Sequence, residues 1–116
     1  MSRYVVLYLA PQSVAHRFAQ ATPEEAQQGL QHWIDWQQKL GPHLLDPGRP
    51  LGNAQRVSTS GVSPSASQVI GMSIIQAESM ENALELVKGH HHLSWADECS
   101  IEVLEEMPIP ELDGQP

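Results

Sequence analysis

The sequence predicts an α+β fold of the ferredoxin-like type, in which two β-α-β units share one antiparallel sheet. Three observations predict it: four segments have strand patterns, two have helical periodicity, and they follow the order strand, helix, strand, strand, helix, strand. The chain has 116 residues, the length of one ordinary domain. We therefore expect a single domain over residues 1–107, with an irregular, proline-rich tail over residues 108–116.

The first strand and the first helix have clear local signals. Residues 3–9 are β-branched and aromatic, which is typical of a strand. After a polar connection, Thr22 and Glu25 have the spacing of a capping box, with Pro23 in the first helical position. The apolar residues from there to Leu40 share one broad helix face, so this helix is expected to cover the core.

The remaining elements follow from turn residues and periodicity. Residues 44–59 contain several prolines and glycines, which predicts an irregular second strand completed by residues 57–59, with a small-residue turn after it. Residues 67–77 are expected to form the third strand, and Ser79 to cap a helix that ends at Lys88 and Gly89. Residues 99–105 alternate as a fourth strand.

Two of the predicted strands carry apolar side chains on both faces. In residues 4–9 and 69–75, apolar residues occupy odd and even positions alike. Two helices cover only one face of a sheet, and an apolar sheet face in water is unfavourable by about 25 cal/mol per Å². We therefore expect a homodimer in which two sheets pack face to face as a dimeric α+β barrel.

Composition excludes several classes of protein. The formal net charge is −8 and the six basic residues are scattered, which disfavours nucleic-acid binding. The short apolar run at the start ends at Pro11, so no signal peptide or membrane span is expected, and a cytoplasmic location follows. The single cysteine, Cys99, precludes an intramolecular disulfide. No pattern predicts a cofactor.

The second half of the chain resembles the YCII-related proteins, including their DGPF-type branch. A strand ending in Ile74-Ile75-Gln76-Ala77 leads through a small capping residue to a helix, then to a turn with consecutive histidines and to a strand with Ile101-Glu102-Val103. The Thr22-Pro23-Glu24-Glu25 start and the Trp33 and Trp36 pair are similar to the first helix of the same family. The resemblance covers most of the chain and implies a dimeric α+β barrel.

The resemblance also implies where a site would lie. Some members of the family carry a histidine on the first helix and an aspartate in a turn after the second helix, together in a cleft. His32 lies near the matching helix position, whereas Gly89 or His90 stands in place of the aspartate. The Gly-Pro-Phe segment of the DGPF branch is also absent before the third strand.

The first helix and the strand after it supply candidate site residues. His32 has Asp35 three positions on and Trp36 one turn on, an arrangement suited to general acid or base catalysis because the pKa of an imidazole is near neutrality. The alternative is a surface histidine in a weak ion pair. Asp46 precedes Pro47 in the irregular strand, where it is either a turn residue or part of a cleft.

The consecutive histidines His90, His91 and His92 are the most unusual feature of the sequence. In an extended chain His90 and His92 would point to one side and His91 to solvent. Two imidazoles are too few ligands for zinc, so a metal site is not expected. Two alternatives remain: imidazoles that bond the carbonyls at the end of the second helix, or a ligand site formed by His90 and His92 with Trp95.

Glu102 is the last candidate. In the alternating fourth strand it lies on the face opposite Ile101 and Val103, so helix-facing Ile101 and Val103 would send Glu102 toward the dimer cavity. There its pKa would be raised and it would act as a base; at a sheet edge it would simply be solvated.

Two classes of function fit these residues. The first is a small enzyme or ligand-binding barrel that carries out proton transfer on a small organic molecule. The second is a non-catalytic dimeric accessory protein that meets another protein through its acidic surface or tail. The sequence does not name a substrate.

Overall fold

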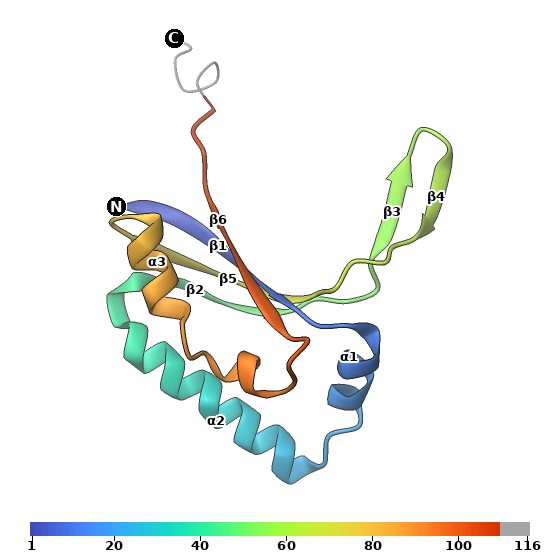
Figure 1. Ribbon diagram of the computed structural model, residues 1–116, viewed down its shortest axis with the longest axis horizontal. Coiled ribbons are helices and arrows are strands. Elements are labelled where there is room, and N and C mark those ends of the chain that lie inside the picture. Colours follow the sequence, from blue (N-terminus) through green and yellow to red (C-terminus); the bar gives the residue numbers. More distant parts are fainter. Residues whose placement is uncertain (110–116) are drawn as a thin grey trace.

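A computed structural model describes residues 1–109, which form a mixed α+β structure (Figure 1). A four-stranded antiparallel sheet has the order β2-β5-β1-β6. Its strands are β1 (Ser2–Leu9), β2 (Leu44–Pro50), β5 (Val69–Ala77) and β6 (Ser100–Glu105). The helices are α1 (Gln12–Ala19), α2 (Pro23–Leu40) and α3 (Met80–Val87), with 3-10 turns η1 (Gly41–His43) and η2 (His91–Ser94).

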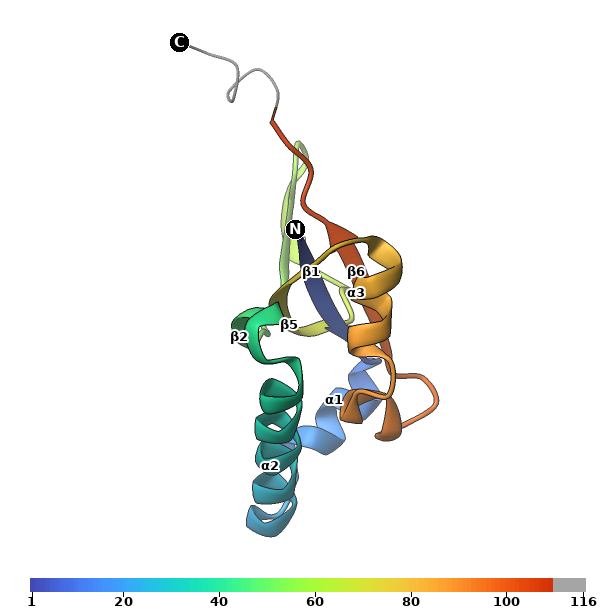
Figure 2. The same ribbon diagram turned by 90° about the vertical axis from the view of Figure 1, so that its left-hand side faces the viewer.

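Helices α2 and α3 pack against the same face of the sheet. Alternate residues of β1 and β5 point to this face and form the core with Trp36 and Leu40 of α2 and with Ala83 and Val87 of α3. The strand residues that take part are Tyr4, Val6, Tyr8, Ile75 and Ala77. In Figure 2, α2 lies below the strands, whereas α3 lies at their level, next to β6.

The caps that the sequence indicates are present. The Thr22 side chain accepts a hydrogen bond from the Glu25 N–H, and the Glu25 carboxylate accepts one from the Thr22 N–H, so the predicted capping box is confirmed. Ser79 caps α3 by accepting a hydrogen bond from the Asn82 N–H. Gly89 follows α3 with a φ of 76°, a conformation that glycine adopts without strain.

The segment that was expected to be a polar connection contains helix α1. Its start is fixed by Pro11, whose carbonyl accepts hydrogen bonds from Val14 and Ala15. Val14 is buried with Ala10 and Cys99 in a second, smaller cluster. The segment is short and polar apart from this contact, and its helical form therefore depends on packing that periodicity alone did not reveal.

The middle of the chain also differs from the prediction. Residues 57–59 do not extend the second strand, which ends at Pro50. A separate hairpin follows, with strands β3 (Gln55–Ser58) and β4 (Gly61–Pro64), and it projects away from the sheet and the helices (Figure 1). All eight of its strand residues are exposed.

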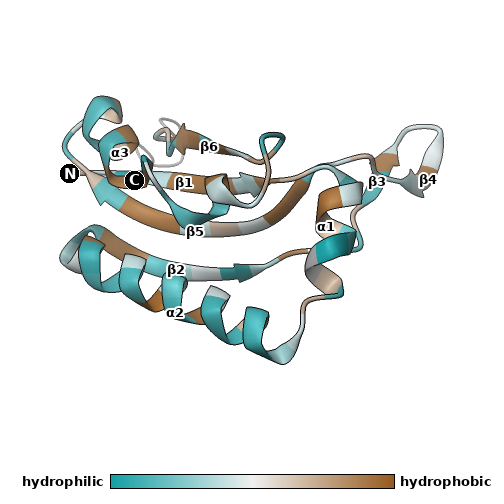
Figure 3. Ribbon diagram, turned by 60° about the horizontal axis from the view of Figure 1, so that its bottom comes forward, coloured by the Kyte–Doolittle hydropathy of each residue, from teal (hydrophilic) through white to brown (hydrophobic). Residues whose placement is uncertain are grey.

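The outer face of the sheet is apolar at its centre, and residues 1–109 leave it uncovered. Val5, Leu7 and Leu9 of β1 and Met72 and Ile74 of β5 point to the side opposite the helices and are partly exposed. The hydropathy colouring of Figure 3 shows the apolar character of β1 and β5 against the polar outer surface of α2. The expected tail lies mostly in residues 110–116, outside the described residues.

Candidate functional site

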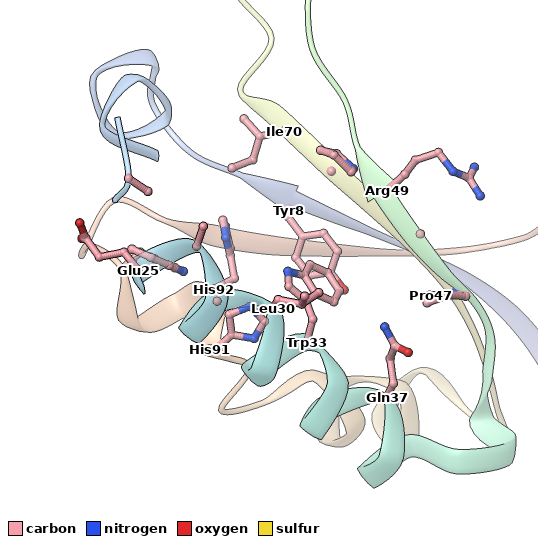
Figure 4. Close-up of a pocket in the computed structure, with 17 residues that line it drawn as sticks. Tyr8, Glu25, Leu30, Trp33, Gln37, Pro47, Arg49, Ile70, His91 and His92 are labelled. Carbon is pink, nitrogen blue, oxygen red and sulfur yellow. The ribbon is translucent and has the colours of Figure 1, made fainter. Parts of the chain in front are cut away.

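A cavity of about 630 Å³ opens between the first half of α2, the irregular strand β2 and the histidine turn η2 (Figure 4). Its volume is within the range of small-molecule sites, roughly 300–1,000 Å³. The lining residues come from β1, α2, β2, β5, the histidine turn η2 and the residues that flank α2 and η2: Tyr8, Ala21, Glu25, Ala26, Gly29, Leu30, Trp33, Gln37, Pro47, Gly48, Arg49, Pro50, Ile70, Gly71, His91, His92 and Trp95.

This cavity explains why part of the apolar face of α2 is not in the core. Trp36 and Leu40, in the second half of the helix, are buried, whereas Leu30 is 59% exposed. The first half of α2 extends past the packed part of the sheet, and its apolar side chains line the cavity instead (Figure 4). The prediction that this whole face covers the core is therefore wrong for its first half.

The irregular strand β2 forms the wall of the cavity that lies opposite α2. The register of β2 against β5 shifts between Asp46 and Arg49. Gly48 has a φ of 89°, and a Cβ at this position would lie 1.5 Å from the Met72 carbonyl oxygen. Asp46 holds the bend by accepting hydrogen bonds from the Gly48 N–H at 2.8 Å and from the Arg49 guanidinium at 3.0 Å.

Asp46 is therefore a turn residue, which was one of its two expected roles. The hydrogen bond from Gly48 holds the pKa of its carboxyl below the usual value. Its partner Arg49 borders the cavity, but the guanidinium points away from it (Figure 4). The charge of this pair is thus directed to solvent.

Tyr8 lies at the centre of the cavity floor. The Ser73 hydroxyl donates a hydrogen bond of 2.7 Å to the Pro47 carbonyl, so the Tyr8 hydroxyl is the donor in its 2.9 Å bond to Ser73. Burial raises the pKa of Tyr8. The phenol is therefore neutral and already satisfied, and it supplies an aromatic surface.

Trp33 forms the aromatic wall together with Tyr8. Their ring centroids are 5.2 Å apart at an interplanar angle of 80°, the edge-to-face geometry that aromatic pairs prefer. Trp33 also contacts His90 and His91 at 5.1 and 5.2 Å. The wall is thereby fixed in place before any ligand arrives.

The histidine run is a 3-10 turn and not an extended segment. His90 is its N-cap: its Nδ1 accepts a hydrogen bond of 3.0 Å from the His92 N–H, so the neutral ring carries its proton on Nε2. His92 Nε2 donates a hydrogen bond of 2.9 Å to the Leu9 carbonyl at the end of β1. An imidazole does bond a backbone carbonyl, but the carbonyl belongs to β1 and not to the end of the second predicted helix, α3, so that alternative is wrong in its acceptor.

The expectation that His91 points to solvent is wrong. His90 is buried beneath the turn, whereas the half-buried His91 lines the cavity together with His92. The two-residue alternation of an extended chain does not apply to a 3-10 turn, which has three residues per turn.

Three imidazoles form a stack that leads from the core to the surface. The centroids of His90 and His91 are 4.3 Å apart, and those of His91 and His32 are 5.5 Å apart, with nearly parallel rings. Burial, and then the neighbouring imidazoles, lower the pKa of His90 to about 3 and that of His91 to about 4. Both rings are therefore neutral at pH 7.

A second, smaller cleft of about 220 Å³ adjoins the cavity. The two share Glu25, Gly29, His91 and Trp95. The cleft adds polar side chains, namely Gln28, His32 and Ser94. His91 and Trp95 thus lie at the boundary between an apolar cavity and a polar opening.

The structure brings together some of the predicted site residues and separates others. His32, His92 and Trp95 line the cavity or its cleft, and His90 supports the turn beneath them. Trp36 is buried in the core and touches His90. Asp35 accepts a hydrogen bond from Gln31 and lies outside both cavities.

Glu102 does not belong to this site. It pairs in register with Leu7, whose side chain is on the outer sheet face, so the Glu102 carboxylate is on the far side of the sheet and exposed. Its expected position opposite Ile101 and Val103 is confirmed. A role for Glu102 would depend on the dimer.

The sequence reasoning missed Tyr8, Leu30, Trp33 and His91 as lining residues. The sequence did contain an indication for Leu30 and Trp33: the apolar face of α2 is longer than is needed to cover a sheet of four strands. Tyr8 and His91 had no such signal, since their places depend on the bend in β2 and on the turn η2.

Cys99 is buried, and burial raises the pKa of its thiol. A thiol with a raised pKa is a poor nucleophile; desolvation is the larger cause of this rise and the neighbouring charge of Glu98 a smaller one.

Among residues 1–109, no three His, Cys, Asp or Glu side chains come together as they would around a metal ion. The helices within that range are all too short or too polar to cross a membrane.

No protein-family model matches the sequence, and no curated protein matches it either.

Proposed function

We propose that this chain is a small-molecule-binding protein of the YCII-related, ferredoxin-like type and that it works as a homodimer. The cavity between α2 and β2, with its preformed wall of Tyr8 and Trp33, carries this proposal. The order and spacing of the sequence motifs support the family, and the strand order β2-β5-β1-β6 supports the ferredoxin-like fold.

Binding is better supported than catalysis of proton transfer. Two titratable side chains, Glu25 and His91, line both the cavity and its cleft. The Glu25 carboxylate is exposed and accepts the Thr22 N–H in the cap of α2, so His91 is better placed to act on a ligand. With a pKa of about 4 it is a weak base at neutral pH, whereas an efficient general base has a pKa near the working pH. Its neutral ring is suited to hydrogen bonding and stacking.

The apolar outer face of the sheet supports the homodimer. Val5, Leu7 and Ile74 are held on this face by the sheet register, and α2 and α3 occupy the other face. Packing two such faces together would remove both from water.

The uncharged dye Nile red tests the proposed cavity. The dye should bind with a rise in fluorescence, and Leu30→Arg should abolish the rise because it places a charge in the cavity. Leu84→Arg is the matched control: Leu84 is 42% exposed on α3 and does not line the cavity. Equal dye binding by the two variants would refute the proposal.

A further inference from the structure

The charges around the cavity define which ligands it accepts. The titratable or charged side chains that line the cavity and its cleft are Tyr8, Glu25, His32, Arg49, His91 and His92. Each has a place in the structure that decides whether it can compensate a charge on a ligand.

The groups deep in the cavity are held by hydrogen bonds or kept neutral by burial. Tyr8 donates to Ser73, and His92 donates to the Leu9 carbonyl. His91 is neutral at pH 7 because burial and its histidine neighbours lower its pKa. Tyr8 and His91 therefore offer no charge to a ligand, and the Nε2 hydrogen of His92 is already bonded.

The two permanent charges are held elsewhere. The Arg49 guanidinium bonds Asp46 and points away from the cavity (Figure 4). The Glu25 carboxylate accepts the Thr22 N–H at the start of α2 and lies at the exposed end of the cavity. An exposed carboxylate is screened by water and attracts a cation only weakly.

We infer that the cavity selects uncharged amphiphiles, with the apolar part between Trp33 and Pro47 and a hydrogen-bonding end at His91, where the apolar cavity meets the polar cleft. This inference rests on the proposed function of the same cavity. A charged group inside it would lose its hydration without gaining an opposite charge, and such a transfer is strongly unfavourable.

Three probes that differ only in their end group test the inference: 4-phenylbutan-1-ol, 4-phenylbutan-1-amine and 4-phenylbutanoate, titrated calorimetrically at pH 7. The alcohol should bind at least tenfold more tightly than either charged probe. Equal or tighter binding of the amine or the carboxylate would overturn the inference and leave the proposed cavity standing. Binding by none of the three would overturn both.

One variant, compared with a matched control, tests where the polar end of the ligand lies. His91→Phe keeps a ring in the stack but removes its nitrogens, and should weaken alcohol binding about threefold to tenfold. His16→Phe, at an exposed histidine of α1 outside the cavity, should have no effect. Melting temperatures show whether both variants are folded. If His91→Phe is folded and binds the alcohol unchanged, the polar end does not lie at His91 and the inference fails.

Discussion

At the scale of single residues, Gly48 has the strictest requirement in the chain. Its φ of 89° is open to glycine but strained for other residues, and a Cβ would lie 1.5 Å from the Met72 carbonyl oxygen. The bend that forms one wall of the cavity therefore needs a glycine at this position.

Gly48→Ala should destabilise the protein by more than about 2 kcal/mol, because the backbone of β2 or β5 must shift. Urea unfolding measures the change. Gly52→Ala is the control, since a Cβ there meets nothing within 4 Å and Gly52 has no positive φ. Similar small effects of both substitutions would show that the bend is not fixed by Gly48.

His90 couples folding to pH. Its pKa is about 3 in the folded chain and about 6.5 in the unfolded chain, so between these values the unfolded state binds the extra proton. The contribution of His90 to the free energy of unfolding is fully present above about pH 6.5. As the pH is lowered below this value, the contribution decreases by about 1.4 kcal/mol per pH unit.

The free energy of unfolding should therefore drop by about 2 kcal/mol from pH 6.5 to pH 5, from His90 alone. Carboxylates such as Glu25 and Asp46, whose pKa values are lowered, contribute only at more acidic pH. Urea unfolding at several pH values gives the slope. His90→Phe should reduce it and His16→Ala should not; a flat profile in the unmodified protein would contradict the burial of a neutral His90.

At the scale of elements, the sequence predicted correctly those features that depend only on neighbouring residues. The capping residues Thr22 and Ser79 were predicted correctly because caps satisfy backbone groups within a few residues. The histidine turn was not, since its 3-10 form depends on His90 being enclosed by Trp33, Trp36 and Tyr8, which come from other elements.

The hairpin β3–β4 was missed for a related reason. Segments 55–58 and 61–64 are short and mostly polar, and residues 60–66 were interpreted only as a turn of small residues. Their pairing makes a separate two-stranded sheet that touches no core residue. A strand with both faces exposed does not need alternating apolar and polar residues, so its sequence lacks the hydropathy pattern by which strands are recognised.

Replacing residues 55–64 by a short Gly-Ser linker should change the melting temperature of the protein by no more than about 2 °C, because the hairpin strands are fully exposed. Thermal unfolding followed by circular dichroism measures this. A large fall would mean that the hairpin packs against something, for which the partner chain of the proposed homodimer would be the first candidate.

At the scale of the whole molecule, the two faces of the sheet have different roles. One face holds the core and the cavity, and the other presents apolar side chains that one chain leaves uncovered. The sequence predicted this two-sidedness directly, because alternation in a strand assigns faces without knowledge of the fold. It did not predict the cavity, which depends on how far α2 extends past the sheet.

Light scattering at micromolar concentration should give about twice the chain mass of 12.8 kDa. Leu104→Lys should shift the protein to the monomer, because Leu104 is 47% exposed and pairs with Val5 on the outer face. Leu84→Lys, at a similarly exposed leucine on the helix side, should leave the dimer intact. A well-folded monomer of the unmodified protein would contradict the proposed assembly.

The glycine amides offer the most direct test of the central claim, that a small uncharged molecule binds between α2 and β2. Gly29, Gly48 and Gly71 line the cavity, whereas Gly41, Gly52, Gly61 and Gly89 do not. In a ¹H–¹⁵N titration with 4-phenylbutan-1-ol, the first three signals should shift in a saturable way and the other four should stay in place. Shifts confined to the second group, or no saturable shift at any glycine, would contradict the claim.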